Sequence, residues 1–568
     1  MRILNAEQHR RREQELIATS SSLKLMENAG AAVVEVIRGE NLHTNRDVVV
    51  CCGPGNNGGD GWVIAALLHE MTKGPSSVTV YSFGEKASLS EEASECRRGA
   101  EASGLTVREI VNESDVEMLP DNVKDRLIVD ALFGSGLNRP ITGVVANAVE
   151  WINQLRDRAA AVSAATKVVS VDIPSGLAGD SPSAIGPTVN ADYTVALVSP
   201  RVAHVVRPAA RHVGELTVHD FSGFSEETKK LVAGEADVLR WPDIGYGRDE
   251  SPRIVLAECN SDDSLWTLFA QNPDTLNTHK GNFGRVTIVA GSRGKTGAAQ
   301  LAGMGALRAG AGLVTIVGPE SCREELSRIP ECMTVGLPDR DGIVSGIGLD
   351  VLDEMQHDVI AVGPGLGVGS GPKALVEKIF GFTNVPLVLD ADALTIVSRD
   401  GGLDLLKSAG SARPDFTSPP VIVTPHPGEM SRLTRKTVEQ VQANRLTVAS
   451  EFAKKYSVYV VLKGDQAISA TPYGHIGINT TGNTGMSTGG SGDVLTGVLA
   501  AFLGREVNIA EDGSIDRHAS NWGELVQDVV YLHGYAGDLA AKKFGQRGLI
   551  ASDIATCFGK AVCDHGGL

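Results

Sequence analysis

Three apolar runs in the first half of the chain end in polar residues that could take part in catalysis. The run "VVVCC" leads into "GPGNNGGDG", which carries Asn56, Asn57 and Asp60. Asp130 ends "LIVD", and Asp172 ends "VVSVD". A single aspartate at such a place most often caps the next turn or helix. Because open α/β sheets bind ligands outside the carboxyl ends of their strands, three such ends beside glycine-rich loops indicate one shared site.

The spacing Gly53-x-Gly55-x-x-Gly58 fits the dinucleotide fingerprint, although this pattern alone is weak evidence and a structural turn is a fair alternative. Its position between a strand and an apolar helix suits phosphate binding at a helix N-terminus. The next strand, "VTVYSF", does not end in an acidic residue that would hold a ribose, since Glu85 lies beyond it. The string therefore indicates nucleotide binding but argues against a standard hydride-transfer site.

The second half contains "TGNTGMSTGGSGDVLTG", a glycine-rich turn that leads into a helix. The apolar face expected for this helix consists of Val494, Leu495, Val498, Leu499 and Phe502. Backbone N–H groups of Gly489–Gly492 would stabilise phosphate and developing negative charge at the helix start. Asp493 is a candidate base there, and the alternative is an N-capping aspartate. The string "GSRGKTG" is not a P-loop, because Val289 stands where that motif needs glycine.

Composition limits the function classes. The 568 residues are 42% hydrophobic and 21% charged, which suggests two or more globular domains. A net charge of −17 argues against nucleic acid as a partner. The eight cysteines form no CxxC pair, the N-terminus has no apolar signal core, and no apolar run is long enough to cross a bilayer. We therefore expect a cytoplasmic protein without a membrane partner.

Apolar strand-like runs alternate with helical patterns along the whole chain, which is typical of parallel α/β sheets. The ten clearest runs are "DVVVCCG", "SVTVYSFG", "RLIVDALFG", "KVVSVDIPSG", "GRVTIVAGS", "GLVTIVGP", "DVIAVGPG", "PLVLDADA", "PVIVTPHPG" and "VYVVLKGD". Residues 225–252 break this rhythm and are the expected linker, so that residues 1–230 and 253–568 form separate domains. The Ala- and Arg-rich stretch 151–166 predicts an exposed helix.

The strings "LMENAG", "GPGNNGGDG", "VDALFGSGL" and "VDIPSGL", in this order, resemble the N-terminal domain of the NAD(P)H-hydrate epimerases. This resemblance implies a Rossmann-like three-layer αβα domain that binds hydrated NADH or NADPH as substrate. It implies Asp172 as the acid/base at the reacting centre and a potassium ion held by Asn57, Asp130 and Ser175. The implied substrate-binding residues are Asn56, Asn57, Gly58, Gly59, Asp60, Gly134, Ser135, Gly136, Leu137, Asn138, Arg139, Pro140 and Asp172. The chain departs from the family pattern at "AGDSP" and "SPRVAH".

The strings "GSRGKTGAAQLA", "GPGLG", "LDADAL", "TPHPGEMSRL", "LKGDQAI" and "NTGMSTGGSGDVLTG" resemble the ADP/ATP-dependent NAD(P)H-hydrate dehydratases. This resemblance implies a ribokinase-like α/β domain, with Asp493 as its catalytic base and Mg²⁺ with ADP or ATP. The residues implied to contact the hydrate are Ala298, Gly365, His426 and Asp493. Those implied to contact the nucleotide are Lys463, Gly464, Asp465, Gln466, Ala467 and Gly492. Thr395 and Thr484 depart from the family pattern.

Together the two resemblances predict a bifunctional repair enzyme that interconverts the R and S hydrates and dehydrates the S hydrate. Its partners would be the hydrated dinucleotide, an adenine nucleotide and further copies of itself in a homo-oligomer. One alternative is a kinase for a vitamin precursor or sugar, with the first domain as a regulatory sensor. Another is a non-enzymatic module that holds a nucleotide or a partner protein.

Overall fold

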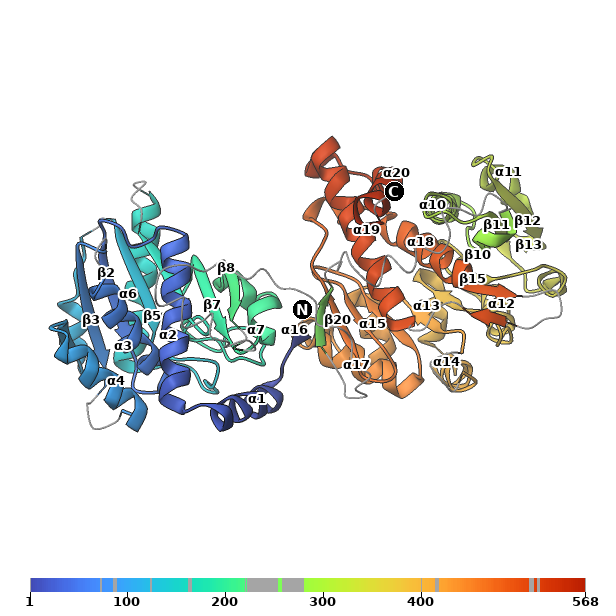
Figure 1. The fold of residues 1–568 in the computed structure, drawn as a ribbon. Coiled ribbons are helices and arrows are strands. Elements are labelled where there is room, and N and C mark those ends of the chain that lie inside the picture. The colour runs from blue at the N-terminus through green and yellow to red at the C-terminus, as the bar shows by residue number, and fades with distance from the viewer. Residues whose placement is uncertain are drawn as a thin grey trace. The chain divides into compact units, whose positions relative to one another are not determined.

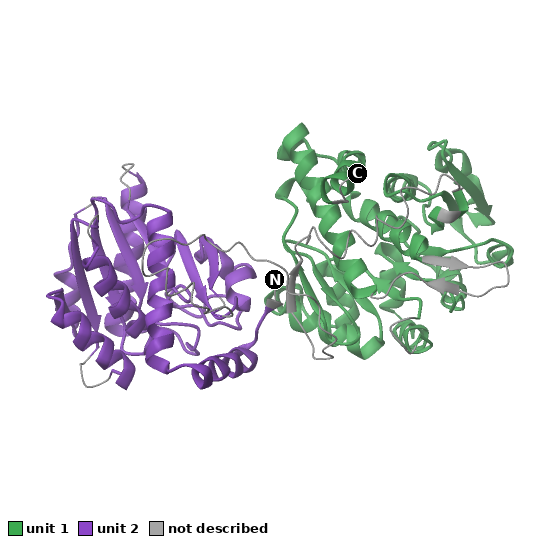
Figure 2. Cartoon of the chain, in the orientation of Figure 1, with its two compact units in different colours: residues 1, 245–568 green, residues 2–244 purple. Residues whose placement is uncertain are grey.

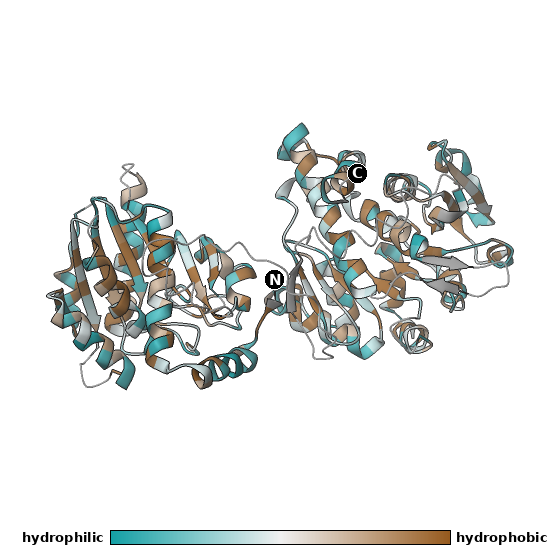
Figure 3. Cartoon of the chain, viewed as in Figure 1, coloured by the Kyte–Doolittle hydropathy of each residue, from teal (hydrophilic) through white to brown (hydrophobic). Residues whose placement is uncertain are grey.

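The chain forms two compact units (Figure 2). In chain order, the first unit consists of residues 2–244, which are purple in Figure 2, and the second unit consists of residues 245–568 with residue 1, which are green. The computed structural model describes residues 2–71, 74–84, 89–122, 125–161, 166–219, 221, 254–257, 280–399, 401–413, 418–509, 515–517 and 522–566 (Figure 1). The expected linker, residues 225–252, lies outside the described residues. Each unit is built around its own sheet, with apolar residues concentrated in the strands and in the helix faces that cover them (Figure 3).

The sheet of the first unit is entirely parallel, in the order β4-β3-β2-β5-β6-β7-β8. Its strands are β2 (Asp47–Cys52), β3 (Ser77–Phe83), β4 (Thr106–Ile110), β5 (Arg126–Ala131), β6 (Lys167–Val171), β7 (Tyr193–Leu197) and β8 (Glu215–His219). Its helices are α1 (Ala6–Thr19), α2 (Ser22–Gly39), α3 (Asn56–His69), α4 (Glu91–Ala102), α5 (Glu113–Glu117), α6 (Gly143–Ala161) and α7 (Val202–Val205). Four runs predicted as strands from the sequence are β2, β3, β5 and β6.

Successive residues of β2 point to opposite faces of this sheet, as a strand requires. Val48 and Val50 belong to an apolar cluster that includes buried residues of α2 and α3. Val49 and Cys51 belong to a separate cluster with buried residues of α6. Helices therefore cover both faces, and the predicted three-layer αβα arrangement is confirmed.

The prediction of an exposed helix over residues 151–166 is wrong in both extent and exposure. Helix α6 begins at Gly143, eight residues earlier, and ends at Ala161. Trp151, Ile152 and Leu155 are buried against the sheet. Buried side chains recur every three or four residues along α6 and form an apolar face. The frequent Ala and Arg residues between them made the segment look exposed in the sequence.

The second unit contains a larger mixed sheet, ordered β9-β20-β19-β18-β17-β16-β15-β10-β11-β12. Its strands are β9 (Ile254–Ala257), β10 (Arg285–Val289), β11 (Leu313–Pro319), β12 (Cys332–Leu337), β15 (Val359–Val362), β16 (Leu387–Leu389), β17 (Val421–Val423), β18 (Tyr459–Leu462), β19 (Ile468–Ala470) and β20 (Ile476–Asn479). Pairing is parallel from β12 to β18 and antiparallel on both sides of β19. The other six predicted strand runs are β10, β11, β15, β16, β17 and β18.

The helices of this unit pack around the sheet and against one another. They are α10 (Thr296–Arg308), α11 (Arg323–Leu326), α12 (Ser370–Phe380), α13 (Ala391–Val397), α14 (Gly402–Ser411), α15 (Pro427–Thr434), α16 (Val438–Ala443), α17 (Arg445–Tyr456), α18 (Ser491–Glu506), α19 (Trp522–Phe544) and α20 (Ala551–Gly566). Two short hairpins complete the unit: β13 (Asp339–Arg340) with β14 (Ile343–Val344), and β21 (Val507–Ile509) with β22 (Ile515–Arg517).

Helix α18 is the central helix of the second unit. All five residues of its predicted apolar face are buried, and so are Thr496, Gly497 and Glu506 on its other sides. A Cβ atom at Gly497 would lie 1.8 Å from the carbonyl oxygen of Ala302 in α10, so only glycine allows this contact between the helices. Helix α18 therefore packs closely against α10 at this point.

No helix in the described ranges is long and apolar enough to cross a membrane. The cysteines found in those ranges are all free thiols.

Candidate active sites

The residues Asn56–Asp60 form the first turns of α3 rather than a loop before it. Gly55 is the N-cap, and α3 begins at Asn56. The glycines of this string permit close packing: a Cβ at Gly58 would lie 1.9 Å from the carbonyl oxygen of Gly53. The helix N-terminus, with its free N–H groups, thus stands directly at the carboxyl end of β2.

The three polar strand ends meet, because β2, β5 and β6 are neighbours in the parallel sheet. A Cβ at Gly134, after β5, would lie 2.9 Å from Oδ2 of Asp172 and 3.5 Å from Cβ of Asn57. The backbone N–H of Ser135 donates to Oδ2 of Asp172 at 2.7 Å. The other carboxylate oxygen of Asp172, Oδ1, is buried and has no hydrogen-bond partner among the described residues. The hydrogen-bonding capacity of this oxygen is therefore unused among the described residues.

Asp130 at the end of β5 and Ser175 after β6 form a buried hydrogen-bonded pair. The hydroxyl of Ser175 donates to one carboxylate oxygen of Asp130 at 2.6 Å, and its backbone N–H donates to the other at 2.9 Å. Burial nevertheless raises the pKa of Asp130, against the effect of these hydrogen bonds. The Asn57 side chain is buried, and neither its Oδ1 nor its Nδ2 has a hydrogen-bond partner among the residues that the structure describes. These side chains offer oxygen ligands, as a hard cation prefers.

Within the described ranges, no group of three or more His, Cys, Asp or Glu side chains could hold a metal ion. The predicted potassium site is of a different type, because Asp130 is its only member of those four residue types. The unpartnered Oδ1 of Asn57 is the observation that fits a bound cation there, whereas its Nδ2 is a hydrogen-bond donor and cannot be a ligand.

Two ionisable side chains near Asp172 add to the electrostatics of the site. Burial, followed by the negative charges of Asp172 and Glu13, raises the pKa of Asp60 well above its usual value. His9 in α1 is also buried and has a raised pKa: burial lowers it, but a hydrogen bond to Glu13 and the charge of Asp172 outweigh that effect. The site thus favours the neutral form of Asp60. The Oδ1 atom of Asp172 has no hydrogen-bond donor among the described residues.

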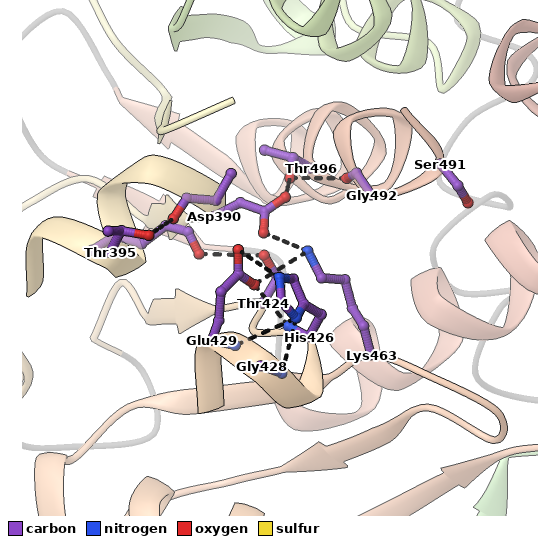
Figure 4. Close-up of polar contacts among 12 residues, drawn as sticks. Asp390, Thr395, Thr424, His426, Gly428, Glu429, Lys463, Ser491, Gly492 and Thr496 are labelled. Carbon is purple, nitrogen blue, oxygen red and sulfur yellow. Dashed lines mark hydrogen bonds and ion pairs between the residues drawn. The ribbon is translucent and has the colours of Figure 1, made fainter. Parts of the chain in front are cut away.

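In the second unit, the buried carboxylate of Asp390 joins three elements (Figure 4). Asp390 occupies the N-cap position of α13, but its side chain makes no capping hydrogen bond. Its Oδ1 accepts a hydrogen bond from Nζ of Lys463 at 2.6 Å, and its Oδ2 accepts one from the Thr496 hydroxyl at 2.8 Å. Because Thr496 lies in α18, Asp390 ties the start of that helix to the carboxyl ends of β16 and β18. A Cβ at Gly492 would lie 3.1 Å from Nζ of Lys463, so this lysine stands at the helix N-terminus.

Asp493 lies in the first turn of α18, beside Gly489–Gly492, as predicted. Burial, followed by the negative charge of Asp390, raises its pKa to about 7, while the Lys463 ammonium opposes this and Glu429 adds to it. Burial likewise raises the pKa of Glu429 to about 7. A carboxyl group with a pKa near neutrality can both accept and release a proton under ordinary conditions, as a general base must.

His426 is the N-cap of α15 and therefore has a structural role in addition to any contact with a ligand. Its Nδ1 accepts from the backbone N–H of Gly428 at 3.0 Å, and the Glu429 carboxylate accepts from the backbone N–H of His426 at 2.8 Å (Figure 4). This is a reciprocal capping box. Because Nδ1 accepts, the ring proton is on Nε2, and half of the side chain faces solvent.

Comparison with known proteins now identifies the family. Residues 22–203 match the family model described as YjeF-related protein N-terminus, and residues 286–558 match the model described as NAD(P)H-hydrate dehydratase. The bifunctional NAD(P)H-hydrate repair enzyme of Thermofilum pendens is 36% identical over 95% of this chain and 91% of its own length. The chain belongs to the bifunctional NAD(P)H-hydrate repair enzymes. The predicted resemblance is thus confirmed, and nothing in these matches favours the vitamin or sugar kinase alternative.

Other repair enzymes agree over the same extent. The Moorella thermoacetica enzyme is 34% identical over 94% of this chain and 91% of its own length. The enzyme of Escherichia coli is 31% identical over 95% of this chain and 89% of its own length. A crystal structure of the ADP/ATP-dependent NAD(P)H-hydrate dehydratase from Bacillus subtilis, co-crystallised with ATP/Mg²⁺, is 28% identical, covers 53% of this chain and 97% of that one, and gives a TM-score of 0.43.

Some of the predicted substrate-binding residues of this repair enzyme lie close together in the structure, whereas others are exposed to solvent. Gly134 and Ser135 lie against Asp172, whereas Asn138, Arg139 and Pro140 are exposed. Ala298 and Gly365 are adjacent, since a Cβ at Gly365 would lie 3.2 Å from Cβ of Ala298.

The predicted nucleotide loop follows β18. Gly464 and Gln466 adopt positive φ angles of 133° and 52°. The guanidinium of Arg445 donates to the backbone carbonyls of Leu462 and Lys463 at 3.2 and 3.3 Å and holds the loop in this shape.

Sequence reasoning missed Asp390, Glu429 and Thr496 in the second unit. Asp390 and Glu429 stand inside "LDADAL" and "TPHPGE", which were noted as family strings without a role for either carboxylate. In the first unit it missed His9, Glu13 and His204. They lie far from the glycine-rich strings, and only the fold places them near Asp172.

Proposed function

We propose that residues 1–230 interconvert the R and S hydrates of NADH and NADPH and that residues 253–568 dehydrate the S hydrate. Membership of the repair-enzyme family supports the pair of reactions. The observation that supports the division of labour is one distinctive carboxyl group in each unit: Asp172, whose buried Oδ1 has no hydrogen-bond partner among the described residues, and Asp493, whose pKa is raised to about 7.

In the first reaction, Asp172 exchanges a proton with the hydroxyl of the hydrate. The hydroxyl is on a carbon next to the ring nitrogen, whose lone pair expels it as water once Asp172 has donated a proton. The resulting iminium takes water back on either face, and Asp172 removes the proton again. Asn57, Gly58, Gly59 and Asp60 at the start of α3, with Gly134–Pro140, hold the dinucleotide around this carboxylate. The N–H of Ser135 fixes Oδ2 of Asp172, which leaves Oδ1 to face the hydroxyl.

Asn57, Asp130 and Ser175 would hold a potassium ion beside this centre. When bound, the ion supplies positive charge next to buried carboxylates and to the dinucleotide phosphates. The unpartnered amide of Asn57 and the oxygen-only ligand set support this part of the proposal.

In the second reaction, Asp493 takes the proton of the hydrate's hydroxyl while that oxygen attacks the terminal phosphoryl group of an adenine nucleotide. The new O–P bond forms as the nucleotide's terminal P–O bond breaks. The ring nitrogen's lone pair then expels phosphate, a far better leaving group than hydroxide, and leaves an iminium ion. Loss of a proton from the neighbouring ring carbon then restores NADH or NADPH. The start of α18 directs N–H groups toward the negative charge that develops during transfer.

Lys463, Gly464, Asp465, Gln466, Ala467 and Gly492 would hold the nucleotide, and Ala298, Gly365 and His426 would hold the hydrate. Mg²⁺ bound with the nucleotide neutralises charge on its phosphates. The position of the Lys463 ammonium at the N-terminus of α18 supports this assignment.

The test uses the full chain with purified R and S hydrates. Added ADP or ATP with Mg²⁺ should restore the dihydronicotinamide absorbance from the S hydrate. Without nucleotide, chromatography should show the two epimers approaching equilibrium faster than they do spontaneously. Phosphorylation of a vitamin precursor or sugar, with no recovery of NADH from its hydrate, would establish the kinase alternative instead.

We also propose a cytoplasmic homo-oligomer that does not bind nucleic acid. The free thiols among the described residues support the compartment, and the strongly acidic composition supports weak binding to nucleic acid.

A further inference from the structure

The backbone of Asp172 is held in a conformation that aspartate seldom adopts. Its φ angle is +63°, in the left-handed region, where a side chain with a Cβ atom is strained. Asp172 directly follows β6, and this turn of the backbone decides where its carboxylate points. Such strain persists only where neighbouring groups hold the residue in place.

His204 supplies one of those restraints. Its Nε2 lies 2.7 Å from the backbone carbonyl oxygen of Asp172, and the imidazole is 3% exposed. The other ring nitrogen, Nδ1, lies 2.8 Å from the backbone nitrogen of Arg201. Because a backbone N–H can only donate, Nδ1 accepts, the ring proton is on Nε2, and Nε2 donates to Asp172.

The short helix α7 keeps His204 in this position. Arg201 is its N-cap, and His204, three residues later, accepts the N-cap backbone N–H in the manner of a capping box. The guanidinium of Arg201 is buried and pairs with Asp180 at 2.7 Å. Burial lowers the pKa of His204 to about 4, so that the ring is neutral over the physiological range and keeps one donor and one acceptor.

Three groups hold Asp172, each through a different atom, and the first is the backbone carbonyl of Val195, which accepts from the backbone N–H of Asp172 at 2.9 Å. Ser135 fixes the carboxylate through Oδ2, and His204 fixes the backbone through the carbonyl oxygen. Between them they leave Oδ1 buried and unpartnered. We propose that His204 is a positioning residue for epimerisation, which stabilises the left-handed backbone of Asp172 and so directs its Oδ1 toward the hydroxyl of the hydrate. This inference rests on the proposed role of Asp172.

Two substitutions separate the two hydrogen bonds of the ring. In His204→Gln the amide nitrogen can reach the position of Nε2 and donate to Asp172, while the contact to Arg201 is lost. In His204→Asn the amide oxygen can reach the position of Nδ1 and accept from Arg201, while the donor to Asp172 is lost. Both substitutions remove the aromatic ring, so a difference between the two variants cannot come from the loss of ring packing.

Without the hydrogen bond from His204, only a minor fraction of molecules should keep Asp172 in the left-handed conformation that epimerisation requires. The free-energy cost of that conformation corresponds to about a 5- to 30-fold change in population. We expect His204→Asn to lower kcat for conversion of R to S hydrate by about this factor, with KM little changed, since the dinucleotide contacts remain. His204→Gln should stay within about threefold of the wild type. Equal losses in both variants, or a loss confined to KM, would show a merely structural role and overturn the proposal.

A measurement on the wild type does not depend on how the variants fold. With ¹⁵N-labelled histidine, His204 should appear at neutral pH as a neutral ring protonated on Nε2. The opposite tautomer, or a charged ring, would overturn the proposal because neither fits the donor to Asp172. Asp172→Asn distinguishes the two levels of the argument: if that variant keeps epimerase activity, the proposed function of Asp172 fails. If it loses activity while His204→Asn keeps full kcat, only the role of His204 fails.

Discussion

Dehydration by this repair enzyme should weaken as the pH falls below neutrality. A general base must be ionised to accept a proton, and burial with the charge of Asp390 raises the pKa of Asp493 to about 7. A base with this pKa is about 9% ionised near pH 6 and about 91% ionised near pH 8. The value of kcat/KM for the S hydrate should therefore rise about tenfold between these two conditions.

The neighbouring Glu429 provides the perturbation that tests the cause. Its negative charge contributes to the raised pKa of Asp493, and its own pKa is also about 7, so the two carboxyl groups titrate together. In Glu429→Gln one negative charge is removed, and the midpoint of the rate profile should move to lower pH. Glu451→Gln on the exposed surface of α17 makes the same chemical change away from the site and should leave the midpoint in place.

The assay is recovery of dihydronicotinamide absorbance from pure S hydrate, with saturating nucleotide and Mg²⁺ at each pH. Epimerisation in the same samples, followed without nucleotide, reports whether the chain remains intact over the range. A flat profile, or a midpoint near the ordinary aspartate pKa of about 4, would refute the role of burial at Asp493. A midpoint that shifts equally in Glu429→Gln and Glu451→Gln would refute the electrostatic argument.

Four further outcomes are expected. Asp493→Asn should lower nucleotide-dependent dehydration by about 10²–10⁴-fold and spare epimerisation, while Asp172→Asn should do the reverse; loss of S-hydrate dehydration in a folded Asp172→Asn protein would contradict two independent sites. Replacing potassium by a bulky organic cation should slow epimerisation, and Asn57→Ala should abolish that sensitivity if the amide is a ligand. Gly497→Ala should lower the free energy of unfolding of the second unit, measured in urea, by about 1–3 kcal/mol, because the added Cβ would overlap the backbone of Ala302. Binding to duplex DNA at physiological salt should be weak, and a sub-micromolar Kd with a steep salt slope would contradict this.

The sequence analysis predicted ten continuously apolar strands, but it missed β7, which is also buried along most of its length, and the strands that are more polar. All ten quoted runs form strands, because each is buried on both faces of a sheet and needs no alternation. Strands β4 and β8 lie at the two edges of the first sheet, where most of their residues are at least partly exposed. Their composition resembles that of surface loops, so periodicity alone could not identify them.

The candidate sites divide in a similar way. Asp172, Asp130 and Asn57 could be predicted because each follows a recognisable apolar strand or glycine-rich string. Asp390 was not singled out, since an aspartate after a strand is ordinary until it is seen to bind both Lys463 and Thr496. The lysine and threonine are 73 and 106 residues further along the chain, and no local pattern relates them.

What the sequence determined by itself was therefore the family, the two α/β sheets and the strand ends at which we propose that chemistry takes place. These depend on local strings and on burial of apolar runs, both of which can be read along the chain. Only the tertiary structure showed the surroundings of the proposed catalytic groups. The pKa of Asp493 depends on its burial and on charges from other elements, and the backbone carbonyl of Asp172 lies 2.7 Å from Nε2 of a histidine of α7. Such effects arise from distances of a few ångströms between residues far apart in sequence, which only the folded chain brings together.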